Sequence, residues 1–539
     1  MKFLNLNRYI VGITFIIFFF CLQPIFTHAN NHIAPQHLTP QSESIFTKGA
    51  ILAPQPVQDE NWYLGATPKN IDYNKFPIVF VHGLHGHASE WWGGNEMYGR
   101  AYNEGFRTAF VSLSGESNNW NNGKQLANIL EKIYNHFNGK VNIVAHSKGG
   151  IDTQTALVHF GAHSYVNNVI TLSTPFHGTA LADLAYSAPA KWLMKLLGKL
   201  DPGTESLQTA NMNHFRKITD FNQNTSKNTY YTAAGTDWGS AFSASWFGGV
   251  YLSKVGGPND GQVSVSSAQL PYGNQLFVAP LTHENMHQGS AVFEKINPTL
   301  QKKPDSLQPF SRVTPKAKEI KETNTTFEST EQFINGGILP PLKTIEEKIS
   351  IDSSIHSTNL YILTKNKDIH IEIVSPSKKK YNTKKIKTKF IPRNEVFGGS
   401  YLHSITINQP EEGDWKLYMS SVHEDAYFML SQFNSNPMVE INMDSEVKTN
   451  TSIPLQIKVE NPEILDMDSM KINIKKGESE ISKAIDVNVP EEIKDNMLVK
   501  MIPISNETSN LNITIEIEGK TKQNTNFKRT EVRSIHVSE

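Results

Sequence analysis

The sequence has 539 residues, too many for a single hydrophobic core, and this length predicts three or four domains. Its 51 Lys and Arg residues nearly balance its 52 Asp and Glu residues. That balance argues against a protein dedicated to binding polyanions, so no nucleic acid partner is expected.

The N-terminus has the layout of a secretory signal peptide. Two basic residues precede an uncharged apolar stretch from Tyr9 to Phe26, and small residues lead to Ala29. We expect a signal peptide over residues 1–29, a polar N-terminal extension over 30–60, and a secreted, extracellular protein. A retained membrane anchor is the alternative. Because the only cysteine, Cys21, lies inside the apolar stretch, the mature chain would contain no disulfide.

Residues 61–297 alternate between two kinds of segment. Helix-like stretches, such as 123–137 and 151–161, separate short apolar runs typical of buried strands. The runs lie at 76–81, 107–113, 141–145, 167–173 and 228–235. This alternation predicts an α/β domain whose mostly parallel sheet is covered by helices on both faces.

The composition changes near residue 298. A charged, proline-containing segment over 298–350 is typical of a linker. Beyond it, apolar residues alternate with polar ones, as at Ile369, Ile371 and Ile373, which is the pattern of half-buried strands. We therefore predict one or two C-terminal β-sandwich (Ig-like) modules. A break near residues 434–438 favours two, at 351–435 and 436–539.

The stretch VNIVAHSKGG (141–150) ends an apolar strand on a serine followed by glycines and a helical pattern. This is the arrangement of a nucleophile elbow, whose tight turn needs small neighbours and exposes the serine hydroxyl at the carboxyl end of the sheet. An ordinary strand-to-helix loop is the alternative. Ser147 is the candidate nucleophile.

A serine nucleophile needs a base, an acid that orients the base, and donors for the oxyanion. Candidates for all three occur in the required chain order. Asp260 lies in a loop after the strand at 228–235, and His283 and His287 follow a further apolar run. Upstream, the strand at 76–81 ends in His-Gly-Leu84, so the backbone N–H groups of Leu84 and Lys148 could form the oxyanion hole.

Residues 61–297 resemble a bacterial secreted lipase or esterase of the α/β-hydrolase superfamily. The segments that carry the resemblance are HGLHG (82–86), AHSKGG (145–150), STPFHGT (173–179), NDGQVSVSSA (259–268) and LTHEN (281–285). The resemblance implies Ser147 as nucleophile, Asp260 as acid and His283 as base, with Leu84 and Lys148 as oxyanion donors. It covers less than half of the chain and says nothing about the C-terminal modules.

Two positions depart from the family pattern. Lys148 stands where Gln or Met is more usual, and its ammonium group would alter the field at the oxyanion. Several lipases of this group hold a structural calcium near the histidine loop, with an aspartate two residues after the histidine. Here that position is Asn285, a weaker ligand, so calcium is left as an alternative. The chemistry itself requires no cofactor.

Two groups of histidines could instead bind a metal ion. HENMH (283–287) matches the His-Glu-x-x-His signature of zinc proteases, which requires a helix with both histidines on one face and a third ligand. His82, His85 and His87 could likewise be ligands. We favour roles in shaping the oxyanion loop and lining the pocket, and predict no metal site.

The insertion after the STPFHG turn contains an amphipathic stretch, AKWLMKLLGKL (190–200). Its apolar residues fall on one helical face, with lysines off that face. A core-facing surface helix is one interpretation. The other is a lid over the acyl pocket that opens at a lipid–water interface. The candidate substrate or lid residues are Trp192, Leu193, Leu196, Leu197 and Leu200.

The sequence thus predicts a secreted serine hydrolase of carboxylic esters, most specifically a triacylglycerol lipase acting on an ester or lipid substrate. A non-lipid carboxylesterase and a polyester depolymerase are alternatives within the same chemistry. A zinc metalloprotease and a non-catalytic surface-binding protein are alternatives outside it. The C-terminal modules could attach the enzyme to a surface or act as spacers; the sequence leaves the oligomeric state open.

Overall fold

The structure is a computed structural model of the full chain. It describes residues 36–38, 61–92, 94–240, 245–301, 328–381, 383–393, 395–477, 484–485, 492–494, 496–504 and 510–539. The predicted signal peptide, most of the predicted N-terminal extension and residues 302–327 of the predicted linker lie outside the described residues.

The first part of the chain forms an eight-stranded mixed sheet in the order β1-β2-β4-β3-β5-β6-β7-β8. The pairing of β2 with β4 is antiparallel and the other pairs are parallel, which confirms the predicted α/β-hydrolase sheet. The strands are β1 (Gln36–Leu38), β2 (Asn61–Gly65), β3 (Ile78–Val81), β4 (Thr108–Ser112), β5 (Val141–His146), β6 (Val166–Leu172), β7 (Thr229–Gly235) and β8 (Asn274–Ala279).

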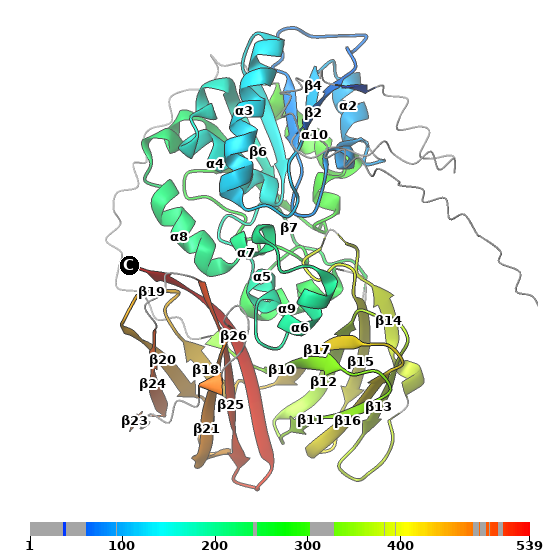
Figure 1. The fold of residues 1–539 in the computed structure, drawn as a ribbon, viewed down its shortest axis with the longest axis vertical. Coiled ribbons are helices and arrows are strands. Elements are labelled where there is room, and N and C mark those ends of the chain that lie inside the picture. The colour runs from blue at the N-terminus through cyan, green and yellow to red at the C-terminus, as the bar shows by residue number, and fades with distance from the viewer. Residues whose placement is uncertain are drawn as a thin grey trace, which may run out of the picture. The chain divides into compact units, whose positions relative to one another are not determined.

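Helices cover both faces of this sheet (Figure 1). On one face, α3 (Asn119–Phe137) and α4 (Lys148–His159) bury apolar side chains against the strands. On the other face, α2 (Met97–Asn103) and α10 (Gly289–Leu300) do the same. Because the central strands are buried on both sides, they are continuous apolar runs rather than alternating ones.

Five further helices lie in insertions beyond the carboxyl ends of β6 and β7. They are α5 (Ala180–Ala185), α6 (Lys191–Leu197), α7 (Pro202–Ser206), α8 (Thr209–Thr219) and α9 (Trp246–Val255). Gly198 ends α6 in a left-handed conformation, with φ 68°, which favours glycine. Because the insertions follow the carboxyl ends of β6 and β7, these helices lie at the edge of the sheet where an α/β fold binds its ligands.

The C-terminal part forms two β-sandwiches, as predicted. The first pairs the sheet β10-β17-β12-β15-β14 with the sheet β11-β16-β13. Its strands are β10 (Gln332–Leu339), β11 (Thr344–Ile351), β12 (Ile355–Thr364), β13 (Ile369–Val374), β14 (Lys387–Phe390), β15 (Tyr401–Asn408), β16 (Gly413–Ser421) and β17 (Asp425–Ser435). Strands β10 and β11 fall inside the segment predicted as a linker, so that boundary is wrong and the first module begins near residue 332.

The second sandwich pairs the sheet β23-β24-β20-β18-β9 with the sheet β19-β26-β25-β21-β22. Its strands are β9 (Glu328–Ser329), β18 (Val439–Asn442), β19 (Glu446–Lys448), β20 (Ser452–Val459), β21 (Leu465–Gly477), β22 (Ala484–Ile485), β23 (Glu492–Lys494), β24 (Met497–Pro503), β25 (Asn510–Thr521) and β26 (Asn526–Ser538). The predicted break near residues 434–438 covers the last two residues of β17 and the segment that joins β17 to β18.

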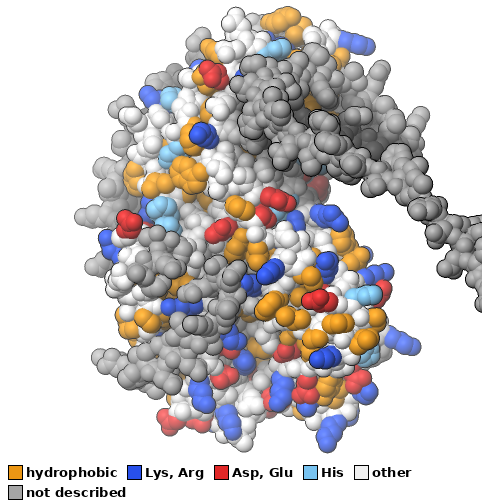
Figure 2. Space-filling view, viewed as in Figure 1, with side chains coloured by type: hydrophobic (Ala, Val, Ile, Leu, Met, Phe, Trp, Pro, Cys, Tyr) orange, Lys and Arg blue, Asp and Glu red, His pale blue; other side chains and the backbone are white. Residues whose placement is uncertain are grey.

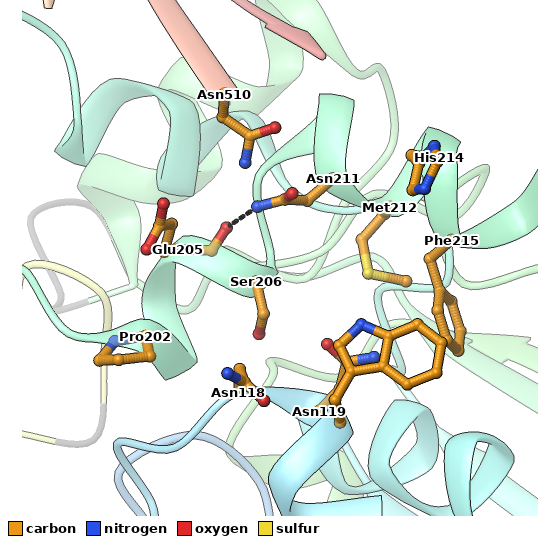
Figure 3. A pocket seen from close by; sticks show the side chains of 11 residues that line it. Asn118, Asn119, Pro202, Glu205, Ser206, Asn211, Met212, His214, Phe215 and Asn510 are labelled. Atoms are coloured by element: carbon orange, nitrogen blue, oxygen red, sulfur yellow. Dashed lines mark hydrogen bonds between the residues drawn. The ribbon is translucent and has the colours of Figure 1, made fainter. Parts of the chain in front are cut away.

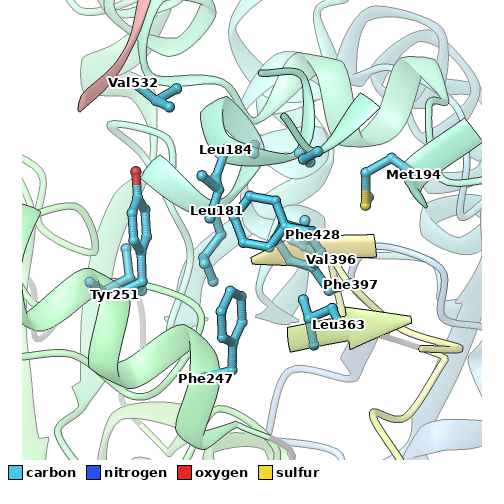
Figure 4. Close-up of a cluster of buried hydrophobic side chains, with 14 of the residues drawn as sticks. Leu181, Leu184, Met194, Phe247, Tyr251, Leu363, Val396, Phe397, Phe428 and Val532 are labelled. Atoms are coloured by element: carbon cyan, nitrogen blue, oxygen red, sulfur yellow. The ribbon is translucent and has the colours of Figure 1, made fainter. Parts of the chain in front are cut away.

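One buried apolar cluster joins the α/β domain to the first module (Figure 4). The inserted helices contribute Leu181, Leu184, Met194 and Phe247, and the module contributes Leu363, Val396, Phe397 and Phe428. The rings of Phe247 and Phe397 meet edge to face, with centroids 5.4 Å apart. The apolar face of the insertion is thus covered by the module and not by solvent.

On the described part of the face drawn in Figure 2, basic and acidic side chains are interspersed over the β-modules. Such mixing agrees with the near-balance of charge in the sequence. Among the described residues, no helix combines the length and the apolar character needed to cross a membrane.

Candidate active site

Ser147 occupies a sharp turn between β5 and α4. Its backbone has φ 51° and ψ −132°, a strained conformation for a residue with a side chain. The turn also needs glycines. A Cβ atom on Gly149 would lie 2.2 Å from the His82 carbonyl oxygen, and one on Gly83 would lie 2.8 Å from Ser147 Cβ. The glycines therefore let the end of β3 pack directly against the candidate nucleophile.

Asp260 and His283 form a hydrogen-bonded pair. The Nδ1 atom of His283 lies 2.9 Å from Oδ2 of Asp260, and the His283 backbone N–H donates to the Asp260 carbonyl over 2.9 Å. The other carboxylate oxygen accepts from the backbone N–H groups of Gln262 (3.0 Å) and Val263 (2.8 Å). These contacts fix the buried carboxylate. Within the part of the chain that the structure describes, Nε2 of His283 makes no hydrogen bond and can face a reacting group.

His283 lies next to the elbow. Its carbonyl oxygen accepts a hydrogen bond of 3.1 Å from Nε2 of His146, the residue before Ser147, and the two imidazole rings are 4.6 Å apart. Among the described residues, no hydrogen bond joins the Ser147 hydroxyl to His283. Such contacts are often long in unliganded enzymes and shorten in the reacting complex.

The surroundings of His283 favour its protonated form. Burial alone would lower the pKa of His283, but the Asp260 carboxylate outweighs this effect and raises the pKa, with further contributions from Glu284 and Glu395. His82, at the end of β3, behaves differently. Burial lowers its pKa to about 4, so it stays neutral while its Nε2 accepts from the Leu113 N–H over 3.0 Å.

Lys148 does not point its charge at the site of the oxyanion. Its ammonium group is buried and lies 2.7 Å and 3.0 Å from the two carboxylate oxygens of Asp152, one helical turn along α4. Asn122 also donates to Asp152 over 3.0 Å. The predicted field effect of Lys148 is therefore offset by a neighbouring negative charge, while its backbone N–H lies at the start of α4.

The comparisons with known proteins agree with this geometry. Residues 74–234 match the family described as "Putative serine esterase (DUF676)". The crystal structure of the Bacillus licheniformis lipase BlEst2 in its propeptide form is 30% identical, with a TM-score of 0.73, and the match covers 89% of this chain and 98% of that one. The chain belongs to this bacterial lipase/esterase family of α/β-hydrolases. The mature form of BlEst2 is 43% identical over 45% of this chain and 99% of that one, with a TM-score of 0.43. A search of curated proteins gave no match.

In this esterase/lipase-like hydrolase, a loop of the first β-module reaches the catalytic domain beside Asp260. The loop spans residues 391–400 and joins β14 to β15. Glu395 accepts hydrogen bonds from Gln262 Nε2 (3.0 Å) and Ser245 Oγ (3.3 Å). Burial raises the pKa of Glu395 to about 7, and the charge of His283 acts on it in the opposite direction. Nothing in the alternating pattern of the module predicted this contact.

The predicted lid stretch forms α6 and the residues that follow it. Leu193 is buried, and Leu196, Leu197 and Leu200 are partly buried against the apolar cluster that α6 shares with the first module. Trp192 is 48% exposed and lies off this face. The single apolar face predicted from the spacing therefore excludes Trp192, and Leu200 lies beyond the end of the helix.

The HENMH stretch does not have the geometry of a zinc-protease helix. Its last residues, Asn285–His287, form a single 3-10 turn, and His283 is engaged with Asp260. His287 is buried, and its ring lies against those of Trp91 and His146. Within the described residues, no three His, Cys, Asp or Glu side chains are grouped so as to hold a metal ion.

A pocket of about 210 Å³ lies at the seam between the catalytic domain and the second module (Figure 3). Trp120, Phe215 and several asparagines of the catalytic domain line it, together with Asn510 of β25. None of Ser147, Asp260 and His283 lines this pocket. It is therefore separate from the candidate catalytic groups.

Proposed function

We propose that the chain is a serine hydrolase that cleaves carboxylic esters with Ser147 as nucleophile, His283 as base and Asp260 as the orienting acid. The observation that carries the proposal is the 2.9 Å contact of His283 Nδ1 with the buried Asp260 carboxylate, next to the strained Ser147 turn. A fixed base, an orienting acid and a serine held on a strained turn beside them are the parts that acyl transfer requires.

In the first half of the reaction, His283 Nε2 removes the proton from Ser147 as the hydroxyl oxygen attacks the ester carbonyl carbon. Backbone N–H groups of Leu84 and Lys148 stabilise the tetrahedral oxyanion. His283 then gives its proton to the leaving alcohol, and an acyl-enzyme remains. Water attacks that ester in the second half, and the same groups return Ser147 and release the acid.

Within this chemistry we propose a lipid ester, such as a triacylglycerol, as the substrate. Two observations support it. The relative BlEst2 is described as a lipase, and the inserted helices carry a large apolar face, covered by the first module in this structure, at the carboxyl edge of the sheet. The signal-like N-terminus supports export of the enzyme to where such lipids are met. Short soluble esters and polyesters are the competing substrates.

We also propose that the C-terminal modules keep the site closed until they are displaced. The 391–400 loop lies on residues that flank Asp260, and Phe397 fills an apolar position against Phe247. The similar BlEst2 structure is described as a propeptide form, which supports a removable part of the chain. The contacts of the 391–400 loop make the C-terminal modules our candidate for that part. Surface attachment, the role considered from the sequence, would instead need a free face on the modules.

The first test is labelling with a fluorophosphonate probe, followed by mass mapping. Labelling, slow in the closed wild-type chain and faster in Phe397→Ala, should occur at Ser147 alone, and Ser147→Ala should abolish both labelling and ester hydrolysis. Ser173→Ala is a matched control, because Ser173 also has a positive φ (51°) at the end of a buried strand. A series of p-nitrophenyl esters and an emulsified triacylglycerol then separates lipase from esterase. Full activity of Ser147→Ala would refute the mechanism.

A further inference from the structure

His85, the residue after the proposed oxyanion donor Leu84, is held in an unusual position. Its backbone has φ 52°, and its N–H donates to the Gly115 carbonyl over 3.0 Å. Gly115 allows this close approach, since a Cβ atom there would lie 2.7 Å from His85 Cα. The His85 side chain is nearly buried, at 6% exposure. A left-handed, buried histidine has a cost in conformational energy, which other contacts must offset.

The His85 side chain is tied to Asp201 on one side. Nε2 of His85 lies 2.9 Å from Oδ2 of Asp201. Asp201 is itself fixed, because it caps the N-terminus of α7: its carboxylate accepts from the Thr204 N–H over 2.9 Å and from the Thr204 hydroxyl over 3.0 Å. Asp201 is therefore a rigid anchor and not a mobile surface charge.

On its other side, His85 meets Lys199. The Lys199 ammonium donates to His85 Nδ1 over 2.8 Å and to the backbone carbonyl of Arg393 over 2.6 Å. Because an ammonium group can only donate, Nδ1 of His85 must accept, so the ring proton lies on Nε2 and is donated to Asp201. Lys199 follows the end of α6, and Arg393 belongs to the 391–400 loop of the first module.

We propose that Asp201, His85 and Lys199 form a hydrogen-bonded chain that positions the oxyanion loop and couples it to α6 and to the C-terminal module. The inference rests on the proposed function, since it concerns the Leu84 donor of that reaction. All three are positioning residues, because none of them touches the reacting atoms. Together they connect the oxyanion hole, the candidate lid and the covering module through one line of contacts.

The surroundings show how this hydrogen-bonded chain would behave when the module is displaced. A cavity of about 620 Å³ lies beside it, lined by His85, Lys199, Arg393 and Lys365, among others. When the module leaves, Lys199 loses its acceptor on Arg393, while its contact with His85 can remain. The oxyanion loop then stays anchored to Asp201 and α6 is released from the module. The chain would thus preserve the catalytic geometry through activation.

The test measures kcat and KM for p-nitrophenyl butyrate in the full chain, with and without the substitution Phe397→Ala. Under the proposed function, this substitution loosens the covering loop and lets substrate reach the site. His85→Leu should lower kcat roughly tenfold to hundredfold with KM within about twofold, because it displaces an oxyanion donor without removing it. His85→Gln, whose amide can still donate to Asp201, should retain kcat within about threefold. His87→Leu is the matched control: His87 is exposed and contacts Ser89.

The hydrogen-bonded chain of Asp201, His85 and Lys199 should also act as a unit. Lys199→Met in the Phe397→Ala background should lower kcat, and the His85→Leu/Lys199→Met double variant should lower it no further than His85→Leu alone. If His85→Leu does not fold, Asp201→Asn keeps the cap and is expected to lower kcat at least about threefold at constant KM. The inference would be overturned if His85→Leu and His87→Leu had equal kcat, or if His85→Leu and His85→Gln lost kcat equally. The proposed function would remain in either case. Absence of Ser147-dependent hydrolysis in every variant would overturn the proposed function and this inference with it.

Discussion

Glu395 of the first β-module accepts a 3.0 Å hydrogen bond from Gln262, the second residue after the buried carboxylate of Asp260. A residue far along the chain therefore lies against the loop that orients the proposed catalytic base. The same loop places Phe397 against Phe247 of α9. This relationship makes the covering role of the module testable without cutting the chain.

Weakening the loop should raise the activity of the intact chain. Phe397→Ala removes a buried ring, a change that costs about 3–5 kcal/mol in a core, while a tenfold shift in the closed–open balance needs only about 1.4 kcal/mol. We expect hydrolysis of a soluble ester to rise roughly tenfold or more. Phe390→Ala is the control, because Phe390 lies on the same hairpin but is 46% exposed. Mass spectrometry must show that the chain is still uncut. An unchanged rate in Phe397→Ala would count against the covering role.

The closure should weaken as pH rises. Docking of the loop raises the pKa of Glu395 from its ordinary value of 4.5 to about 7, because burial disfavours its charge and Glu284 and Asp260 repel it, while His283 and Ser245 act in the opposite direction. The docked loop thus binds protons more tightly than a released one. The stabilisation of the docked loop by protonated Glu395 is complete below about pH 4.5 and is lost as pH rises through about 7.

This pH effect has to be measured on docking itself, because Glu395 also contributes to the raised pKa of His283. Glu395→Gln keeps the hydrogen-bonding shape but cannot titrate, so its docking should not depend on pH in this range. We expect amide hydrogen exchange in residues 395–400, corrected for the intrinsic pH dependence of exchange, to give a ratio of wild type to Glu395→Gln that increases between pH 5.5 and 8.5. A flat ratio would show that Glu395 does not control docking.

The catalytic sheet and its proposed triad were predictable because their signals are local. Each buried strand is a short apolar run, and the glycines after Ser147 indicate a tight turn in which a larger residue would clash. Asp260 lies in a Gly-Pro-Asn-Asp-Gly loop, and its contact with His283 follows from the order of strands in the sheet. These features depend on neighbours in sequence or on a fold whose topology is regular.

Contacts between domains were not predictable in this way. Strand β10 contains Gly336 and Gly337, which weakened its strand pattern and placed it in the predicted linker. Gly336 is needed because a Cβ atom there would lie 2.1 Å from the carbonyl oxygen of Pro189 in the catalytic domain. Glu395 and Phe397 likewise lie in a hairpin loop with no periodicity. Their positions depend on how two separately patterned domains pack together.

Removing the orienting carboxylate should affect both rate and pH dependence. In Asp260→Asn, His283 can no longer donate from Nδ1 to a charged acceptor, and kcat should fall by about 10³–10⁴. Because Asp260 raises the pKa of His283, the variant should also show a lower His283 pKa. The rise of kcat/KM as His283 loses its proton should therefore move to lower pH. A pH–rate profile from pH 4 to 9 measures the shift. A move of that limb to higher pH would contradict the assigned pair.

The buried pair of Lys148 and Asp152 predicts a stability effect that depends on both partners. Lys148→Met leaves the Asp152 carboxylate buried without its cation, which should destabilise the catalytic domain by about 3–5 kcal/mol. Asp152→Asn added to Lys148→Met removes that charge and still accepts from Asn122, so most of the stability should return. Urea unfolding followed by tryptophan fluorescence reports mainly on this domain, because seven of the eight tryptophans lie in it. Equal midpoints for the single and the double variant would show that the ion pair, as found in the structure, does not govern stability here.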